Sequence, residues 1–204
     1  MNNEQAAQWM RQTAEKLVEH KDELSKLDQF VGDGDHGVNM ERGFRAVVEN
    51  LDDWKDLSLS QLMQKIGSAL VSNVGGAAGP LYGTAFMRLG TAWTDVDQVD
   101  GPAWMSGMAK AVEGIAQRGK AQAGDGTLLD VWSPVAAILD ENEPDWKKIE
   151  DAAQTGMEET ESMVVKKGRG ALLGEKSVGH LDPGAVSSFY LFQALAKTMD
   201  EGEG

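Results

Sequence analysis

The chain has 204 residues and no cysteine, and its 33 acidic side chains outnumber its 19 basic ones, giving a net charge of −14. Such a surface repels the phosphates of nucleic acids and anionic lipids, so we expect neither a nucleic-acid partner nor a membrane. The lack of cysteine excludes disulfides, thiolate metal sites and thiol nucleophiles. Residues 1–16 are polar and no apolar run is long enough to span a membrane, so we expect a cytoplasmic protein with a single domain over residues 1–204.

Apolar residues recur at helical spacing along nearly the whole chain, which predicts an all-α fold. The pattern indicates eight helices, whose apolar stripes lie within residues 9–27, 40–51, 62–70, 81–93, 104–115, 128–138, 149–164 and 186–199. Helix core is the interpretation that we give to the methionines and tryptophans in these stripes. Short connections favour antiparallel neighbours, so the sequence predicts an up-and-down bundle or a closed helical barrel.

Successive connections in this topology fall alternately at the two ends of the bundle. The odd-numbered ones are dense in glycine and rich in polar and charged residues, and they cover residues 32–37, 75–80, 118–127 and 168–184. The even-numbered ones are solvated turns with aspartate and proline. Glycine marks turns in general, but that does not explain why it collects in alternate turns. We therefore predict a single functional site at one end of the bundle.

Three aspartates, Asp28, Asp33 and Asp35, lie within eight positions at the end of the first predicted helix and in the loop after it. Carboxylates packed this closely repel one another unless a cation neutralises them. Magnesium uses a few carboxylates together with substrate phosphates. An EF-hand is excluded, because its later glycine and closing glutamate are missing. The alternative to a metal site is a capped polar turn.

Residues 75–79 read GGAAG and come directly before Pro80 and an apolar helix. Free N–H groups at a helix start attract a phosphate, and proline is accepted at the first helical position. Close packing of the helix is the alternative explanation.

Arg169 stands alone among the glycines of the last loop. A guanidinium is suited to stabilise a transferring phosphoryl group, so we predict a catalytic role, with a surface ion pair as the alternative. His36 and His180 also lie in these loops, but an isolated histidine is usually structural, and neither is predicted to be a nucleophile. The residues alone thus indicate a magnesium-assisted nucleotide or phosphate site whose substrate is open.

Four long segments in this order resemble the nucleotide-binding L subunits of dihydroxyacetone kinases. They are LDQFVGDGDHGVNMERGF, GGAAGPLYGTAF, RGKAQAGDGTLLD and GRGALLGEKSVGHLDPGA, and they are spread over residues 27–190. The resemblance implies an eight-helix antiparallel barrel with the nucleotide site at one end. It also implies that Asp28, Asp33 and Asp35 hold two magnesium ions. The nucleotide contacts that it implies are His36, Gly37, Val38, Asn39, Ala77, Ala78, Gly119, Leu128, Arg169, Asp182, Pro183 and Gly184.

Relatives that use ATP directly carry a dihydroxyacetone-binding domain in the same chain, for which 204 residues leave no room. The chain therefore resembles the phosphoenolpyruvate-dependent type. The resemblance implies that ADP is a retained cofactor, which a phosphotransferase-system protein converts to ATP. The phosphoryl group then passes to dihydroxyacetone on a partner K subunit. The oligomeric state is left open, a homodimer included.

Three positions depart from the family pattern. Ala78 stands where serine is usual, Gly126 stands where lysine is common, and Leu172 or Leu173 stands near a usual aromatic. These departures leave open a kinase subunit that exchanges ATP and acts on another small ketose or polyol. A further alternative, since the L subunits of this family work only through partner proteins, is a nucleotide-loaded regulatory module without catalysis of its own.

Overall fold

The structure is a computed structural model that describes residues 1–202, and these residues form helices and turns without a strand. Nine are α-helices: α1 (Asn3–Glu19), α2 (Lys21–Val31), α3 (His36–Asn50), α4 (Leu59–Asn73), α5 (Ala78–Ala92), α6 (Gly101–Gly119), α7 (Leu129–Ala137), α8 (Trp146–Glu159) and α9 (Pro183–Glu201). Two short 3-10 helices, η1 (Thr160–Ser162) and η2 (Arg169–Ser177), lie between α8 and α9. The all-α prediction is confirmed.

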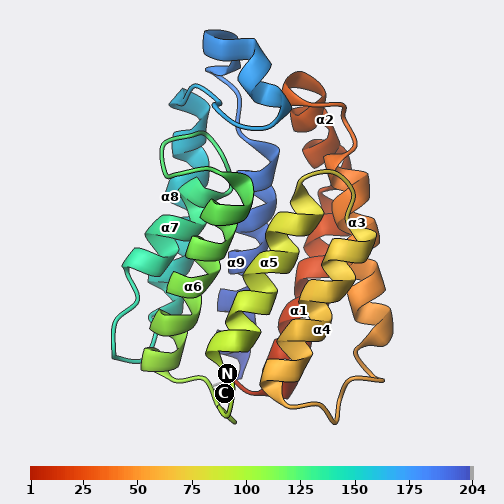
Figure 1. Cartoon of the computed structure of the whole chain (residues 1–204), viewed down its shortest axis with the longest axis vertical. Coiled ribbons are helices and arrows are strands. Elements are labelled where there is room, and N and C mark those ends of the chain that lie inside the picture. The colour runs from red at the N-terminus through yellow and green to blue at the C-terminus, as the bar shows by residue number, and fades with distance from the viewer. Residues whose placement is uncertain (203–204) are drawn as a thin grey trace.

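The helices form a closed ring of antiparallel neighbours (Figure 1). Each helix from α3 to α9 packs against the next one along the chain, and α9 packs against α1, which in turn packs against α3. This closure is the barrel that the short connections predicted. The N-terminus and the C-terminal end of α9 lie at one end of the barrel, and η2 and α2 lie at the other (Figure 1).

The prediction of one continuous first helix is wrong, because the chain breaks at His20 into α1 and α2. His20 stacks on Tyr190 of α9 with ring centroids 4.3 Å apart, and its Nδ1 lies 2.8 Å from the Glu23 carboxylate. Tyr190 donates to the same carboxylate. Buried Leu17 and Leu24, seven residues apart, keep the helical period across the break, so the apolar stripe does not reveal it. Together, α1 and α2 take the place of the first predicted helix, so the eight predicted helices correspond to nine α-helices.

The buried apolar side chains form one continuous core inside the ring. Trp104 is buried in this core and makes edge contacts with Trp9, Trp93 and Trp146, with ring centroids 5.1–6.5 Å apart. Such edge-to-face packing is favourable for aromatic rings. The tryptophans therefore serve the core, as predicted. Among the described residues, no helix is both long and apolar enough to cross a membrane.

Candidate functional site

A cavity of about 710 Å³ opens at the barrel end that carries η2. Its lining includes residues from all four glycine-dense connections, for example Asp33, Gly76, Arg118 and Gly168. The alternation of loop composition along the sequence thus corresponds to one site in space, as predicted.

Asp28, Asp33 and Asp35 converge at the cavity wall, where their ligand oxygens lie within 4.8 Å of one another. Asp28 closes the loop, because its Oδ2 accepts hydrogen bonds from the backbone N–H groups of Asp35 (2.9 Å) and His36 (3.1 Å). A side chain at Gly32 would overlap the Asp28 carboxylate, so this glycine permits the approach. Three hard oxygen ligands at this spacing fit magnesium.

Arg169 forms an ion pair with Asp33, which joins the first residue of η2 to the aspartate cluster. The hydrogen bond from its guanidinium holds the pKa of Asp33 below its usual range. Both side chains are largely exposed, and Arg169 lines the cavity. The cation is thus placed beside the candidate metal ligands, where a transferring phosphoryl group would need it.

The helices that begin at the two ends of the barrel differ in their N-caps. At the end without the cavity, α1, α4, α6 and α8 are each capped by their own N-cap side chain, from Asn2, Ser58, Asp100 and Asp145. At the cavity, α9 has such a cap, whereas α3, α5 and α7 have none. In α5, within residues 1–202, the N–H groups of Ala78 and Gly79 donate no hydrogen bond. Such groups, backed by the helix dipole, form an anion site.

The sequence suggested that proline occupies the first position of α5, and this prediction is wrong. The helix begins at Ala78, and Pro80 is its third residue. The first turn tolerates proline because its N–H groups have no intrahelical acceptor. The earlier start places Ala77 and Ala78 on the cavity wall.

His36 belongs to a buried polar network beneath the cavity. Its Nε2 lies 2.9 Å from Ser187 Oγ, and the Tyr82 hydroxyl lies 2.7 Å from the oxygens of both Ser187 and Ser188. Burial lowers the pKa of His36 to about 4, although the nearby Asp28 and Asp35 carboxylates act to raise it. The ring is therefore neutral at pH 7 and is fixed by α9, which agrees with a structural role.

Most of the predicted site residues line this one cavity. They are Asp28, Asp33, Asp35, His36, Asn39, Ala77, Ala78, Gly119, Leu128, Arg169, Asp182, Pro183 and Gly184. Gly37 and Val38 are not among the lining residues. Gly37 is buried where α3 crosses α2, and Val38 is half exposed. His180 also lies outside the lining and stacks on Phe30.

Two cations of the cavity wall, Arg118 and Lys167, were not predicted. Arg118 opens the quoted segment RGKAQAGDGTLLD, and Lys167 directly precedes Gly168. Their nearness to glycine-dense segments is the signal that could have found them. They are part of the positive charge that a negative chain needs in order to bind an anion.

The sequence profile of the DAK2 domain matches residues 30–197. The chain belongs to the DAK2 domain family. It is 39% identical over 193 residues to the ADP-binding subunit DhaL of PEP-dependent dihydroxyacetone kinase 1 of Listeria innocua, covering 95% of both chains. It is 34% identical to the corresponding DhaL subunit of Escherichia coli, covering 98% of this chain and 99% of the relative.

A solved structure of the dihydroxyacetone kinase of C. freundii, in complex with AMP-PNP and Mg²⁺, has the same fold as this DAK2 domain chain. The match has a TM-score of 0.73 at 28% identity and covers 94% of this chain and 33% of that one. The fold of this chain is thus also found as about one third of a longer kinase chain.

Asp182, the capping residue of α9, is expected to make the stability of this DAK2 domain chain depend on pH. Burial raises the pKa of its carboxyl to about 7 from the usual 3.8. The folded chain then keeps a proton that the unfolded chain has lost, so this group's contribution to stability falls as the pH rises from about 4 to about 7. Asp182→Asn keeps a capping oxygen and removes the titration. Urea unfolding should show the variant to be more stable than the wild type by about 1–2 kcal/mol at high pH.

The same measurement near pH 5 should show a smaller advantage for the variant, because the wild-type carboxyl is then protonated in the fold. An equal difference at both pH values would contradict the raised pKa of Asp182.

Proposed function

We propose that this DAK2 domain chain is the ADP-binding, phosphoryl-transferring subunit of a phosphoenolpyruvate-dependent dihydroxyacetone kinase. The observation that carries the proposal is the convergence of three carboxylates, uncapped helix starts and Arg169 on one cavity. The high coverage of relatives named ADP-binding subunits supports the choice of nucleotide and partner system.

The geometry suits phosphoryl transfer, which needs positioning and charge neutralisation more than a nucleophile. Magnesium, held by Asp28, Asp33 and Asp35, would neutralise the phosphate charge. The N–H group of Ala78 at the start of α5 would hold a phosphate, and Arg169 would meet the charge that develops during transfer.

The partners follow from the same proposal. A phosphotransferase-system protein phosphorylates bound ADP to ATP, and the partner K subunit presents dihydroxyacetone as the acceptor. Two magnesium ions and a cytoplasmic location also belong to this proposal. The three converging carboxylates of Asp28, Asp33 and Asp35 would hold these ions.

The retained cofactor can be tested on the purified protein. After dialysis with magnesium, the protein is denatured and the released nucleotide is identified by chromatography and mass spectrometry. We expect nearly one ADP per chain, because the carboxylates, helix starts and cations that line the cavity would contact the nucleotide together. Light scattering on the same sample measures whether the chain forms a homodimer.

An empty protein that binds ADP and ATP reversibly would favour the second candidate, an ATP-exchanging kinase subunit for another small ketose or polyol. The observation behind it is that Ala78 and Gly126 lack the serine and lysine side chains expected there. Bound ADP without transfer in the presence of every cognate partner would instead indicate a regulatory module.

A further inference from the structure

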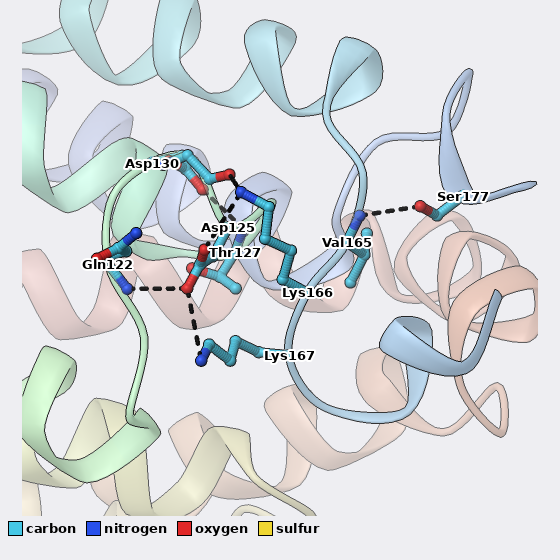
Figure 2. A network of polar contacts seen from close by, with 9 residues as sticks. Gln122, Asp125, Thr127, Asp130, Val165, Lys166, Lys167 and Ser177 are labelled. Carbon is cyan, nitrogen blue, oxygen red and sulfur yellow. Dashed lines mark hydrogen bonds and ion pairs between the residues drawn. The ribbon is translucent and has the colours of Figure 1, made fainter. Parts of the chain in front are cut away.

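Asp125 is a buried carboxylate with two lysines beside it (Figure 2), and one of them, Lys167, lines the cavity. It is 3% exposed, and its oxygens lie 3.6 Å from Lys166 Nζ and 3.7 Å from Lys167 Nζ. Its Oδ2 also accepts a hydrogen bond from the Gln122 backbone N–H, at 3.1 Å. The Asp125 carboxylate thus lies beside two lysine ammonium groups.

Lys166 is already held in this place by shorter contacts. Its ammonium donates to the Gly124 carbonyl at 2.9 Å, and its backbone N–H donates to the Asp125 carbonyl at 2.9 Å. Its side chain is not part of the cavity lining. Lys166 therefore serves as the structural counterion of Asp125.

Lys167 differs from its neighbour in both respects. It lines the cavity, and no hydrogen bond is recorded for its ammonium within residues 1–202. Its 3.7 Å approach to Asp125, like the 3.6 Å approach of Lys166, is longer than a hydrogen bond, so both ion pairs are held by charge alone. Lys166 has the Gly124 carbonyl as a second partner, whereas the Lys167 ammonium lies at the cavity wall with only its loose ion pair.

The backbone around Lys167 is fixed before any ligand binds. Val165 is 4% exposed, and its N–H donates to Ser177 Oγ at 2.9 Å, which ties the segment to the end of η2. Gly168, in the left-handed region at φ +61°, turns the chain between Lys167 and Arg169. The two cations thus reach different parts of the cavity wall, Arg169 at the aspartate cluster and Lys167 at Asp125.

We propose that Lys167 is a phosphate-binding residue of this cavity. When nucleotide binds, the Lys167 ammonium moves away from Asp125 and contacts the diphosphate. This inference rests on the proposed function, since it takes the ligand to be Mg-ADP. Asp125 keeps Lys166 when Lys167 moves, so the rearrangement strands no buried charge. A flexible ammonium suits this exchange of one anionic partner for another.

The test compares three variants of the full chain, freed of nucleotide and refolded if necessary. Affinities for ADP and for adenosine are measured with magnesium by displacement of a fluorescent ADP analogue. Lys167→Gln should weaken ADP binding about tenfold while leaving adenosine unchanged, because one charge-assisted contact to phosphate is lost. Lys197→Gln, which removes an exposed ammonium paired with Glu201 at the far end of α9, should stay within about twofold of the wild type for both ligands. Lys167→Arg should recover most of the ADP affinity.

Two results would overturn the assignment of Lys167. Equal ADP affinities for Lys167→Gln and Lys197→Gln would show that the Lys167 ammonium has no contact with phosphate. Equal losses for ADP and adenosine in Lys167→Gln would show a purely structural role. A wild-type chain that binds no Mg-ADP would instead overturn the proposed function itself, so the two failures are distinguishable.

Discussion

Asp33→Asn is expected to abolish phosphoryl transfer and to leave the helical fold intact. Asp33 provides one of three converging carboxylates, and the amide that replaces it is a weak ligand for a hard cation. The side chain is about half exposed in a loop, so no core contact is lost. Loss of a direct metal ligand should reduce Mg²⁺-dependent ADP affinity more than about 100-fold, since even outer partners of ligands are worth 10–100-fold. Transfer with the cognate partner proteins and titration of ADP with Mg²⁺ measure the effect.

Asp97→Asn is the matched control, because Asp97 is an exposed aspartate in the turn between α5 and α6, at the other end of the barrel. It makes the same change in net charge and should leave ADP affinity unchanged. Full transfer activity in Asp33→Asn would refute the metal-site assignment. Equal thermal unfolding of both variants excludes misfolding as the cause of a loss.

Gly37→Ala is expected to destabilise the chain by about 2–3 kcal/mol, through overpacking where two helices cross. A methyl group at Gly37 would overlap the Lys21 carbonyl, which is rigid helix backbone and cannot turn away as a side chain could. The methyl would also press on Ser25 Oγ, so α2 and α3 must separate. Because α2 carries Asp28 and α3 follows Asp35, magnesium-dependent ADP binding should weaken as well. Urea unfolding measures the stability change.

Val38→Ala, at the next position, removes atoms from a half-exposed side chain and should change stability by less than about 0.5 kcal/mol. If Gly37→Ala were as stable as Val38→Ala, the close helix crossing would be wrong. A loss of nucleotide binding at full stability would instead support the direct nucleotide contact that the sequence predicted for Gly37.

The positions of the four loops could be predicted because composition and topology point the same way. Glycine collects in alternate connections, and alternate connections of an antiparallel ring lie at one end. The exact helix limits could not be predicted. The stripe from Leu17 to Leu24 runs unbroken through His20, and the break depends on the stacking of His20 on Tyr190, a contact between residues far apart in the sequence.

The same reason explains the differences within the site. Gly37 follows His36 directly and looks equivalent to it, yet the path of α2 decides which of the two lines the cavity. Lys166 and Lys167 are adjacent residues of the same type, and only the fold shows which of them lines the cavity. Sequence patterns predict which segments meet, whereas the orientation of single side chains depends on contacts that local sequence does not contain.

Ala78 illustrates how the structure alters the meaning of a departure from the family pattern. The residue lacks the hydroxyl of the usual serine, but it lines the cavity, and its backbone N–H has no acceptor among the described residues. A phosphate can still be bound there by main-chain donors. The departure thus weakens a side-chain contact and leaves the helix start available.

The unequal caps of the two barrel ends would make a nucleotide bound as proposed a structural component of the protein. Helices at the barrel end without the cavity are capped by a serine, asparagine or aspartate side chain. In contrast, α5 begins at an alanine, and its first N–H groups have no acceptor among the described residues. A phosphate at that position would complete the first turn of the helix, as a capping side chain does elsewhere. Release of the ligand would then leave these donors unpaired, which raises the free energy of the empty state. A cofactor that is recharged in place avoids that cost in every cycle.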